Sequence, residues 1–362
     1  FGLCSGAALT IAGVTFTPTI LRWMGTPADV LPQSILYFRC YFCGAIFTVM
    51  YNIFVGILHA VGDSKHPLYY LIFSTFVNIV LDLLFVLVLH WGIAGAAAAT
   101  VFSQLLSGVL CAVKIAKMPE LRMEKRHLTL PPALVRDLFR IGTPSAAKNV
   151  IIAVGGMIVQ SIVNGFGVTF IAGYTATNKL YGVLEVAATS YGFAMTTYAG
   201  QNLGAKKYNR VKDAYLTTVK IGSICAIVLG AAMFLAAEPL IGLFNTENDP
   251  TVLAIAAFKI RTLCIVLVPH IIVMVSSNMF QSLGRPIENL VLSMSRQLLF
   301  LIPIVLILPP VLENLFGYGA YGLACAQALS DLFSFLFLAL PLAVYMFRKI
   351  GDREDGADYP FE

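Results

Sequence analysis

Ten long apolar blocks run along this chain of 362 residues, and they restrict its fold more than any other feature. A helix that crosses a bilayer core about 30 Å thick needs about 20 mainly apolar residues. Because lipid offers the backbone no hydrogen-bond partner, a spanning segment must be a helix or part of a closed barrel, and barrel strands are short and alternating. We therefore expect helices over 1–21, 34–60, 67–90, 93–116, 140–165, 169–199, 214–237, 252–282, 287–311 and 318–347.

The composition is typical of a protein embedded in the lipid bilayer. Hydrophobic residues make up 58% of the sequence and charged residues 12%, about half the charged share of an ordinary soluble domain. No water-facing surface could hide this apolar excess. The sequence therefore predicts an all-α integral membrane protein. Its net charge of +5 reflects basic loops, so no nucleic-acid partner is expected.

The basic residues also predict an orientation, because loops rich in lysine and arginine stay in the cytoplasm. Basic residues cluster at 114–140, at 206–212 and at 348–353, which lie on one side if every block crosses the membrane. The loops on the other side hold almost none. We expect a multi-pass protein of the plasma (inner) membrane with a cytoplasmic C-terminus.

A weak internal repeat relates the two ends of the chain at an offset of about 221 positions, as parallel repeats do in secondary transporters. Residues in the first part find counterparts, in the same order, in the second: Pro18 with Pro239, Arg39 with Arg261, Gly62 with Gly284, Gly92 with Gly319, and Gln104 with Asp331. The offset covers six crossings, an even number, so both copies should point the same way through the membrane.

The repeat predicts two pseudo-symmetric six-helix lobes with about ten of twelve transmembrane helices present. The fifth and sixth blocks have no upstream partners and position 1 is Phe, so two further helices are expected before this chain. We expect an incomplete N-lobe at 1–120, a cytoplasmic linker at 121–139, a C-lobe at 140–347 and a cytoplasmic tail at 348–362. The protein is expected to be monomeric.

Several short motifs carry a family resemblance that extends over residues 1–347. They are YNIFVGILHAVGDSKHP at 51–67, NIVLDLLFV at 78–86, GIAGAAAATVFSQ at 92–104, the stretch 147–167, YAGQNLGAKKYNRVKDA at 198–214, SLGRP at 282–286 and Ser-Arg-Gln at 295–297. Together they resemble the MATE (multidrug and toxic compound extrusion) transporters.

That resemblance implies a cation-coupled efflux antiporter that works by alternating access between two lobes. Such a protein exchanges H⁺ or Na⁺ for small organic, often cationic or amphipathic, compounds, and it needs no cofactor. A lipid or polysaccharide flippase of the same wider superfamily is the alternative, although its cavity should be richly cationic. A membrane-embedded enzyme is a remote alternative, because the five histidines are scattered and no nucleophile–base pair has a usable spacing.

Acidic residues inside apolar blocks are the candidates for cation coupling, since a charge in hydrocarbon costs about 2.5–3.5 kcal/mol and is seldom kept without a function. Glu185 is the most deeply placed acid, and Asp82 and Asp331 lie in the third and tenth blocks. Glu185 could carry a proton or coordinate Na⁺. The alternative is a structural acid held by a partner, or a residue that lines a cavity in contact with water.

Polar side chains in the same blocks are expected to line a substrate cavity. Asn149, Gln160 and Asn164 are spaced by eleven and four positions, so they share one helical stripe; hydrogen bonding between helices is the alternative. The cavity candidates are Asn78, Asn149, Gln160, Asn164, Lys179, Gln281 and Arg296.

Two further expectations concern structure. Arg39 and Arg261 lie near helix ends, where we expect them to snorkel or to cap backbone carbonyls rather than bind substrate. Pro269 lies well inside its block, and proline there should kink the helix. A kink could serve as a hinge or be static.

Overall fold

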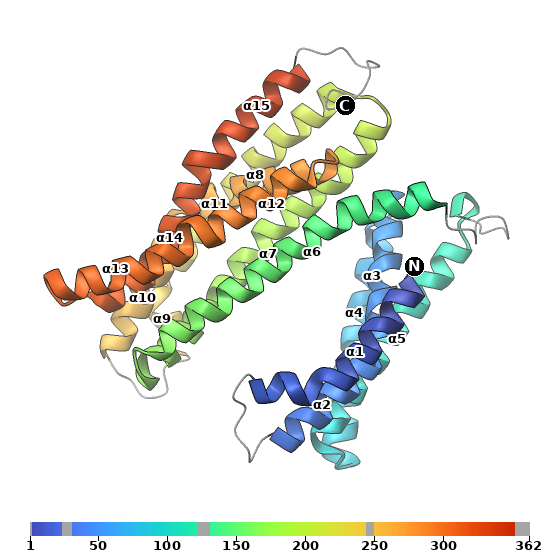
Figure 1. Cartoon of the computed structure of the whole chain (residues 1–362), viewed down its shortest axis with the longest axis horizontal. Coiled ribbons are helices and arrows are strands. Elements are labelled where there is room, and N and C mark those ends of the chain that lie inside the picture. Colours follow the sequence, from blue (N-terminus) through green and yellow to red (C-terminus); the bar gives the residue numbers. More distant parts are fainter. Residues whose placement is uncertain (1, 24–30, 122–130, 244–249, 352–362) are drawn as a thin grey trace. The chain divides into compact units, whose positions relative to one another are not determined.

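A computed structural model describes residues 2–23, 31–121, 131–243 and 250–351, and within these ranges the regular structure is entirely helical (Figure 1). The expected all-α membrane fold is confirmed, and each of the ten apolar blocks lies on helix. Residues 122–130 of the expected linker and 352–362 of the expected tail lie outside the described residues. The chain divides into two compact units, Phe1–Thr129 and Leu130–Glu362.

Unit 1 contains four long helical segments. Its elements are α1 (Gly2–Trp23), α2 (Leu31–Cys43), α3 (Ala45–Ala60), α4 (Lys65–Leu83) with the π-helical extension η1 (Leu84–Val88), α5 (Gly92–Ala116) and the short 3₁₀ turn η2 (Pro119–Leu121). α5 packs against α3 and α4, while α1 packs against α2 and α3. Small residues such as Gly95, Ala97 and Ala99 are buried on α5, which allows close helix contact.

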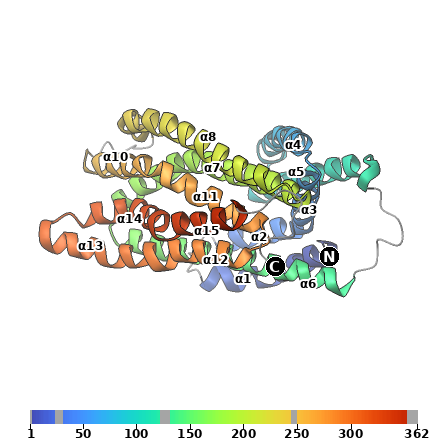
Figure 2. The same cartoon turned by 90° about the horizontal axis from the view of Figure 1, so that it is seen from above.

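Unit 2 contains six long helical segments. Its elements are α6 (Pro132–Asn164), α7 (Val168–Gly204), α8 (Tyr208–Leu235), α9 (Ala237–Gly242), α10 (Pro250–Ile265), α11 (Leu267–Ser282), α12 (Pro286–Met294), η4 (Ser295–Leu301), α13 (Ile302–Phe316), α14 (Gly319–Ser334), η5 (Phe335–Ala339) and α15 (Leu340–Gly351). α6 begins at Pro132, within the segment expected to be linker. α12, η4 and α13 form one continuous rod, and α7 and α8 lie side by side (Figure 2).

Most of the long helices meet the requirements of a membrane span. In the described residues seven helices are long and apolar enough, or nine spans if each of two bent helix pairs counts as one. The sixth expected block, 169–199, forms α7, a helix of 37 residues that is not among these candidates. Its sequence carries Asn178, Lys179 and Glu185 as well as several threonines, which lower its mean hydropathy.

The two bent pairs support the internal repeat. α2 and α3 meet at Gly44 with a bend of 45°, and α10 and α11 meet at Val266 with a bend of 55°. The second break follows the first by about 221 positions, the offset of the sequence repeat. Pro269 lies in the first turn of α11, so the expected kink is confirmed and falls just before the proline.

The two repeat-equivalent arginines cap carbonyls, as expected. Arg39 Nε donates a hydrogen bond to the carbonyl oxygen of Val14 at 3.3 Å. Arg261 Nε donates to the carbonyl oxygen of Phe234 at 3.5 Å, and its Nη2 lies 3.0 Å from Glu238 Oε1. Each arginine thereby links its own helix to another.

An acidic residue, Asp63, anchors the loop between α3 and α4. Asp63 lies 2.7 Å from His66 Nδ1 and 3.7 Å from Lys114 Nζ, which joins the loop to the end of α5. Partial burial acts to raise the pKa of the Asp63 carboxyl, but the hydrogen bonds and charge of His66, helped by Lys114, outweigh it and leave this pKa lowered. The carboxylate is therefore stabilised in its ionised form.

Candidate functional site

A cavity of about 280 Å³ lies inside unit 2, bordered by α6, α7, η4, α13 and α14. Its size is at the lower end for sites that hold small organic molecules. Its wall combines aliphatic side chains with a polar group of residues, namely Gln160, Tyr174, Asn178, Tyr181, Glu185, Arg296, Gln297 and Gln327.

The polar residues contributed by α7 form a single stripe. Tyr174, Asn178, Tyr181 and Glu185 follow one another by four, three and four positions, so they project from the same face of the helix. All four line the cavity. The low hydropathy of α7 is therefore partly a consequence of the face that it turns to this cavity rather than to lipid.

Glu185 is the acid that the cavity wall presents. Its side chain is half-buried, and its carboxylate forms no hydrogen bond or ion pair with any residue of the described ranges. Arg296 lines the same cavity from η4. A carboxylate placed in this way is able to receive a cation from the cavity.

Arg296 and Asp331 form a closed ion pair behind the cavity wall. Arg296 Nε lies 2.6 Å from Asp331 Oδ1, and the Asp331 side chain has 0% exposure. Arg296 lies in a π-helical segment, where a wider turn leaves backbone groups in need of partners. The hydroxyl of Ser330 donates to the Arg296 carbonyl oxygen at 2.7 Å. The pair thus fixes η4 against α14.

His270 extends this pair toward the bend in α10–α11. Its Nδ1 lies 3.1 Å from Asp331 Oδ2, within ion-pair distance. The angles at these two atoms do not allow a hydrogen bond between them. Its Nε2 lies 3.4 Å from the hydroxyl oxygen of Tyr181. The buried network therefore runs from the cavity residue Tyr181 to the first turn of α11.

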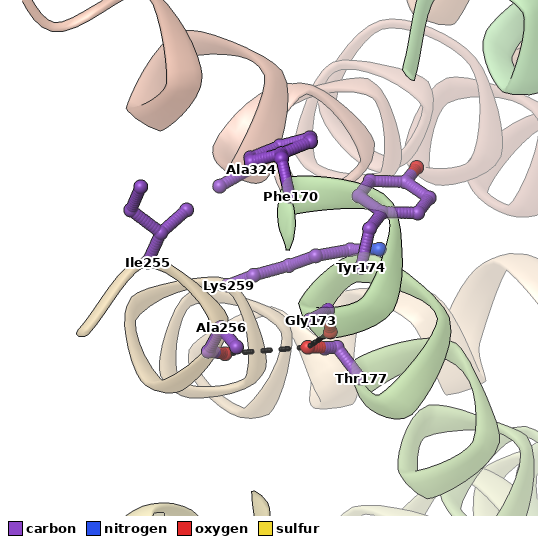
Figure 3. Close-up of a pocket in the computed structure, with 8 residues that line it drawn as sticks. All are labelled: Phe170, Gly173, Tyr174, Thr177, Ile255, Ala256, Lys259 and Ala324. Atoms are coloured by element: carbon purple, nitrogen blue, oxygen red, sulfur yellow. Dashed lines mark hydrogen bonds between the residues drawn. The ribbon is translucent and has the colours of Figure 1, made fainter. Parts of the chain in front are cut away.

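Lys259, on α10, is a second buried cation next to the cavity. Its side chain is 1% exposed. It extends toward α7, where Nζ donates to Asn178 Oδ1 at 2.6 Å and lies 3.0 Å from the centroid of the Tyr174 ring (Figure 3). A water-sized space of about 10 Å³ adjoins it, lined also by Phe170, Thr177 and Ala324. Both of its partners line the large cavity.

The remaining predicted residues of unit 2 fall in different places. Gln160 lines the cavity and donates to Asn164 Oδ1 at 2.9 Å, so these two share a stripe, but Asn164 is not among the residues that line the cavity. Asn149 and Lys179 are exposed and do not line the cavity. Gln281 does not line it either, because its Oε1 accepts a hydrogen bond from Asn289 Nδ2 at 2.9 Å.

Unit 1 holds a smaller polar cavity of about 70 Å³ between α4 and α5. Apart from Leu71, its lining consists of hydroxyl and amide side chains: Ser74, Thr75, Asn78, Thr100, Ser103, Gln104 and Ser107. Asp82 lies one turn beyond Asn78. Within the described part of the chain, Asp82 Oδ1, Asn78 Nδ2, Gln104 Oε1 and Ser74 Oγ are buried without a hydrogen-bond partner. These atoms are available to a small polar ligand.

Sequence reasoning did not single out Lys259 or assign a role to His270. Lys259 carried a usable signal, since it is a cation inside the apolar block 252–282, which it shares with Arg261. His270 had a weaker signal, because its importance comes from Asp331 and Tyr181, which are distant in sequence.

Comparison with known proteins identifies the family. The family model MatE matches residues 1–84 and 144–307, more than half of the chain. The chain belongs to the MATE family. It is 30% identical over 262 residues to the Bacillus subtilis protein named "Probable multidrug resistance protein YoeA", which covers 70% of this chain and 57% of that protein. It is 25% identical over 338 residues to the FAD transporter of Shewanella oneidensis, covering 88% and 74%.

The fold is also that of solved MATE transporters. The crystal structure of the Vibrio cholerae transporter VcmN, a variant protein, matches with a TM-score of 0.88 at 18% identity, covering 100% of this chain and 78% of that one. This likeness shows the two-lobe fold. The chain spans just over half the length of the first curated relatives that it matches. The family and the relatives are transporters, and the chain is a multi-pass membrane protein.

Proposed function

We propose that the protein exports small organic compounds, cationic or amphipathic, in exchange for H⁺ or Na⁺. The two lobes alternately open the binding site to either side of the plasma membrane, with the C-terminus in the cytoplasm. Membership of the MATE family and the relative named as a multidrug resistance protein support this proposal.

The cavity of unit 2 is the observation that carries the proposal. Glu185 offers a carboxylate that forms no hydrogen bond or ion pair within the described residues, although it interacts at longer range with the charge of Arg296, and the rings of Tyr174 and Tyr181 lie on the same face of α7. An organic cation gains from a carboxylate and from aromatic faces, the latter by about 0.5–2 kcal/mol each. Asp331, which Arg296 already engages, is assigned a positioning role.

The coupling cation is assigned to unit 1. Asn78 lines the polar cavity, and Asp82 lies one turn farther along α4. The hydroxyl and amide oxygens of the cavity are the ligands that a hard cation such as Na⁺ prefers. A carboxylate at this position can equally carry a proton. Separate places for substrate and coupling ion are consistent with exchange through a change of conformation.

An efflux assay tests the substrate role of Glu185. In a drug-hypersensitive bacterium the wild-type protein should lower ethidium accumulation, and Glu185→Gln should remove most of this effect because the cation loses its counter-charge. Glu238→Gln, on the exposed acid that pairs with Arg261, is the matched control and should retain efflux. Unchanged efflux by Glu185→Gln at equal membrane abundance would exclude this role.

Export of an anionic nucleotide is a second candidate function. The observation in its favour is the pair of cations at the cavity, Arg296 in the wall and Lys259 behind it, and one relative is named as a FAD transporter. Competition between FAD and ethidium for the purified protein separates the two candidates. A flippase is less favoured, because Arg296 is the cation among the described lining residues and Asp331 engages it.

A further inference from the structure

Lys259 occupies the interior of unit 2 as an ammonium group without an acidic partner. Its exposure is 1%, and no carboxylate of the described residues lies within 4 Å of Nζ. Its two partners are the amide oxygen of Asn178 and the aromatic face of Tyr174; Figure 3 shows Lys259 extended toward the Tyr174 ring. A buried charge normally keeps an ion-pair partner, and one that lacks a partner tends to give up its charge.

The elements packed around Lys259 carry other titratable groups, but within the described residues none of them forms an ion pair or a hydrogen bond with its Nζ. α7 presents Tyr174 itself and, farther along its stripe, Tyr181 and Glu185. On α14, Tyr321 packs on Phe258. On α9, Glu238 pairs with Arg261, and on α11, His270 lies against Asp331. On α8, Cys225 Sγ accepts a hydrogen bond from the hydroxyl of Tyr191, which lies on α7. The ammonium is therefore balanced by none of them at short range.

The partners of Lys259 are the groups that an organic cation would use. Asn178 Oδ1 and the Tyr174 ring hold the ammonium, and both residues also line the large cavity. A cation that enters the cavity and binds at Glu185 meets Tyr174 on the same helical stripe. It then competes with Lys259 for these groups and repels the ammonium, because two positive charges would share one poorly hydrated site.

We propose that Lys259 carries a proton which is released when an organic cation binds in the cavity of unit 2. In this step one N–H bond of the ammonium breaks, the electron pair stays on Nζ, and the proton passes to water in the cavity. The positive charge of the substrate replaces that of Lys259. This inference rests on the proposed function and adds a second proton-exchanging group to it, distinct from Glu185 and Asp82.

The test measures proton release on ligand binding, with no ion gradient. Purified protein in detergent, in weakly buffered solution with a pH-indicating dye, is titrated with ethidium to saturation. Wild-type protein should release about one proton per bound ethidium, as linkage between the two sites requires. Lys259→Met should bind ethidium at least as tightly but release no proton. Lys148→Met, which removes a lysine of α6 that does not line the cavity, should behave as wild type.

The possible outcomes separate this inference from the proposed function. Glu185→Gln should bind ethidium more weakly but still release the proton at saturation. If proton release persists in Lys259→Met, or if Glu185→Gln alone abolishes it, Lys259 is not the releasing group, while export of organic cations stands. If wild-type protein binds no ethidium, both ideas fail. Should Lys259→Met not fold, Lys259→Gln, which keeps a hydrogen-bond donor for Asn178, replaces it.

Discussion

At the residue scale, the buried charges of unit 2 differ in what balances them. Asp331 has Arg296 at 2.6 Å and His270 at 3.1 Å, whereas Lys259 has an amide and a ring. Breaking a buried pair by removing one partner leaves an uncompensated charge, which costs about 3–5 kcal/mol. Removing both partners of such a pair is often much less costly.

The Arg296–Asp331 pair should therefore show strong coupling in a double-mutant cycle. Arg296→Met is expected to lower the free energy of unfolding by about 3–5 kcal/mol, and adding Asp331→Leu should restore a large part of it. Thermal or denaturant unfolding of the purified variants measures this. If the losses of the two single variants simply add in the double variant, the pair is not an energetic unit.

Single residues were predictable where a charge stood out in an apolar block. Glu185, Arg296 and Asp331 were found in this way, and the structure places Glu185 and Arg296 on one cavity wall. Asn149 and Gln281 were chosen as uncharged polar side chains in the apolar blocks, but they do not line it. A periodic stripe predicts which residues share a face, yet it cannot say how far along the helix a cavity extends or which polar groups find local partners.

At the element scale, the break between α10 and α11 connects the cavity to a bend. Pro269 has no N–H to donate to the carbonyl oxygen of Ile265, the last residue of α10. A continuous helix through this point would therefore lack one backbone hydrogen bond. His270, the next residue, contacts the network of Asp331 and Tyr181. A change at the cavity wall can thereby reach the bend.

Pro269→Ala should favour a straighter α10–α11, because alanine restores the missing hydrogen bond and is the best helix former. The expected result is a protein that unfolds at a higher temperature but transports ethidium more slowly. Pro286→Ala is the matched control, since Pro286 occupies the first position of α12, where proline costs the helix nothing. Faster or unchanged transport by Pro269→Ala would show that the bend is not a hinge.

Elements were the most predictable level, because ten blocks of membrane length leave little choice of structure. The ends of the helices were less predictable. α6 starts at Pro132 rather than at 140, and α7 reaches Gly204. Both extensions carry polar residues and lie beyond the apolar core of the block. Hydropathy detects the part of a helix that meets lipid, whereas hydrogen bonding and loop geometry decide where the helix stops.

At the scale of the whole molecule, the repeat shows how the two units differ. Gln104 and Asp331 are repeat-equivalent, and Ser74 precedes Arg296 by about 221 positions. Unit 2 has an ion pair at this place, while unit 1 has a small polar cavity in which Ser74 Oγ, Asn78 Nδ2 and Gln104 Oε1 lack hydrogen-bond partners in the described residues. Under the proposed function, the equivalent helices hold an organic substrate in one unit and a small cation in the other.

This division of labour is the central claim, and transport in proteoliposomes tests it most directly. With purified protein, an imposed H⁺ or Na⁺ gradient should drive ethidium movement, and the effective gradient identifies the ion. Asp82→Asn should abolish gradient-driven movement while ethidium still binds, and Asp137→Asn, on the exposed acid of α6, should leave both unchanged. If neither gradient moves ethidium through the wild-type protein, or if Asp82→Asn transports normally, the account is contradicted.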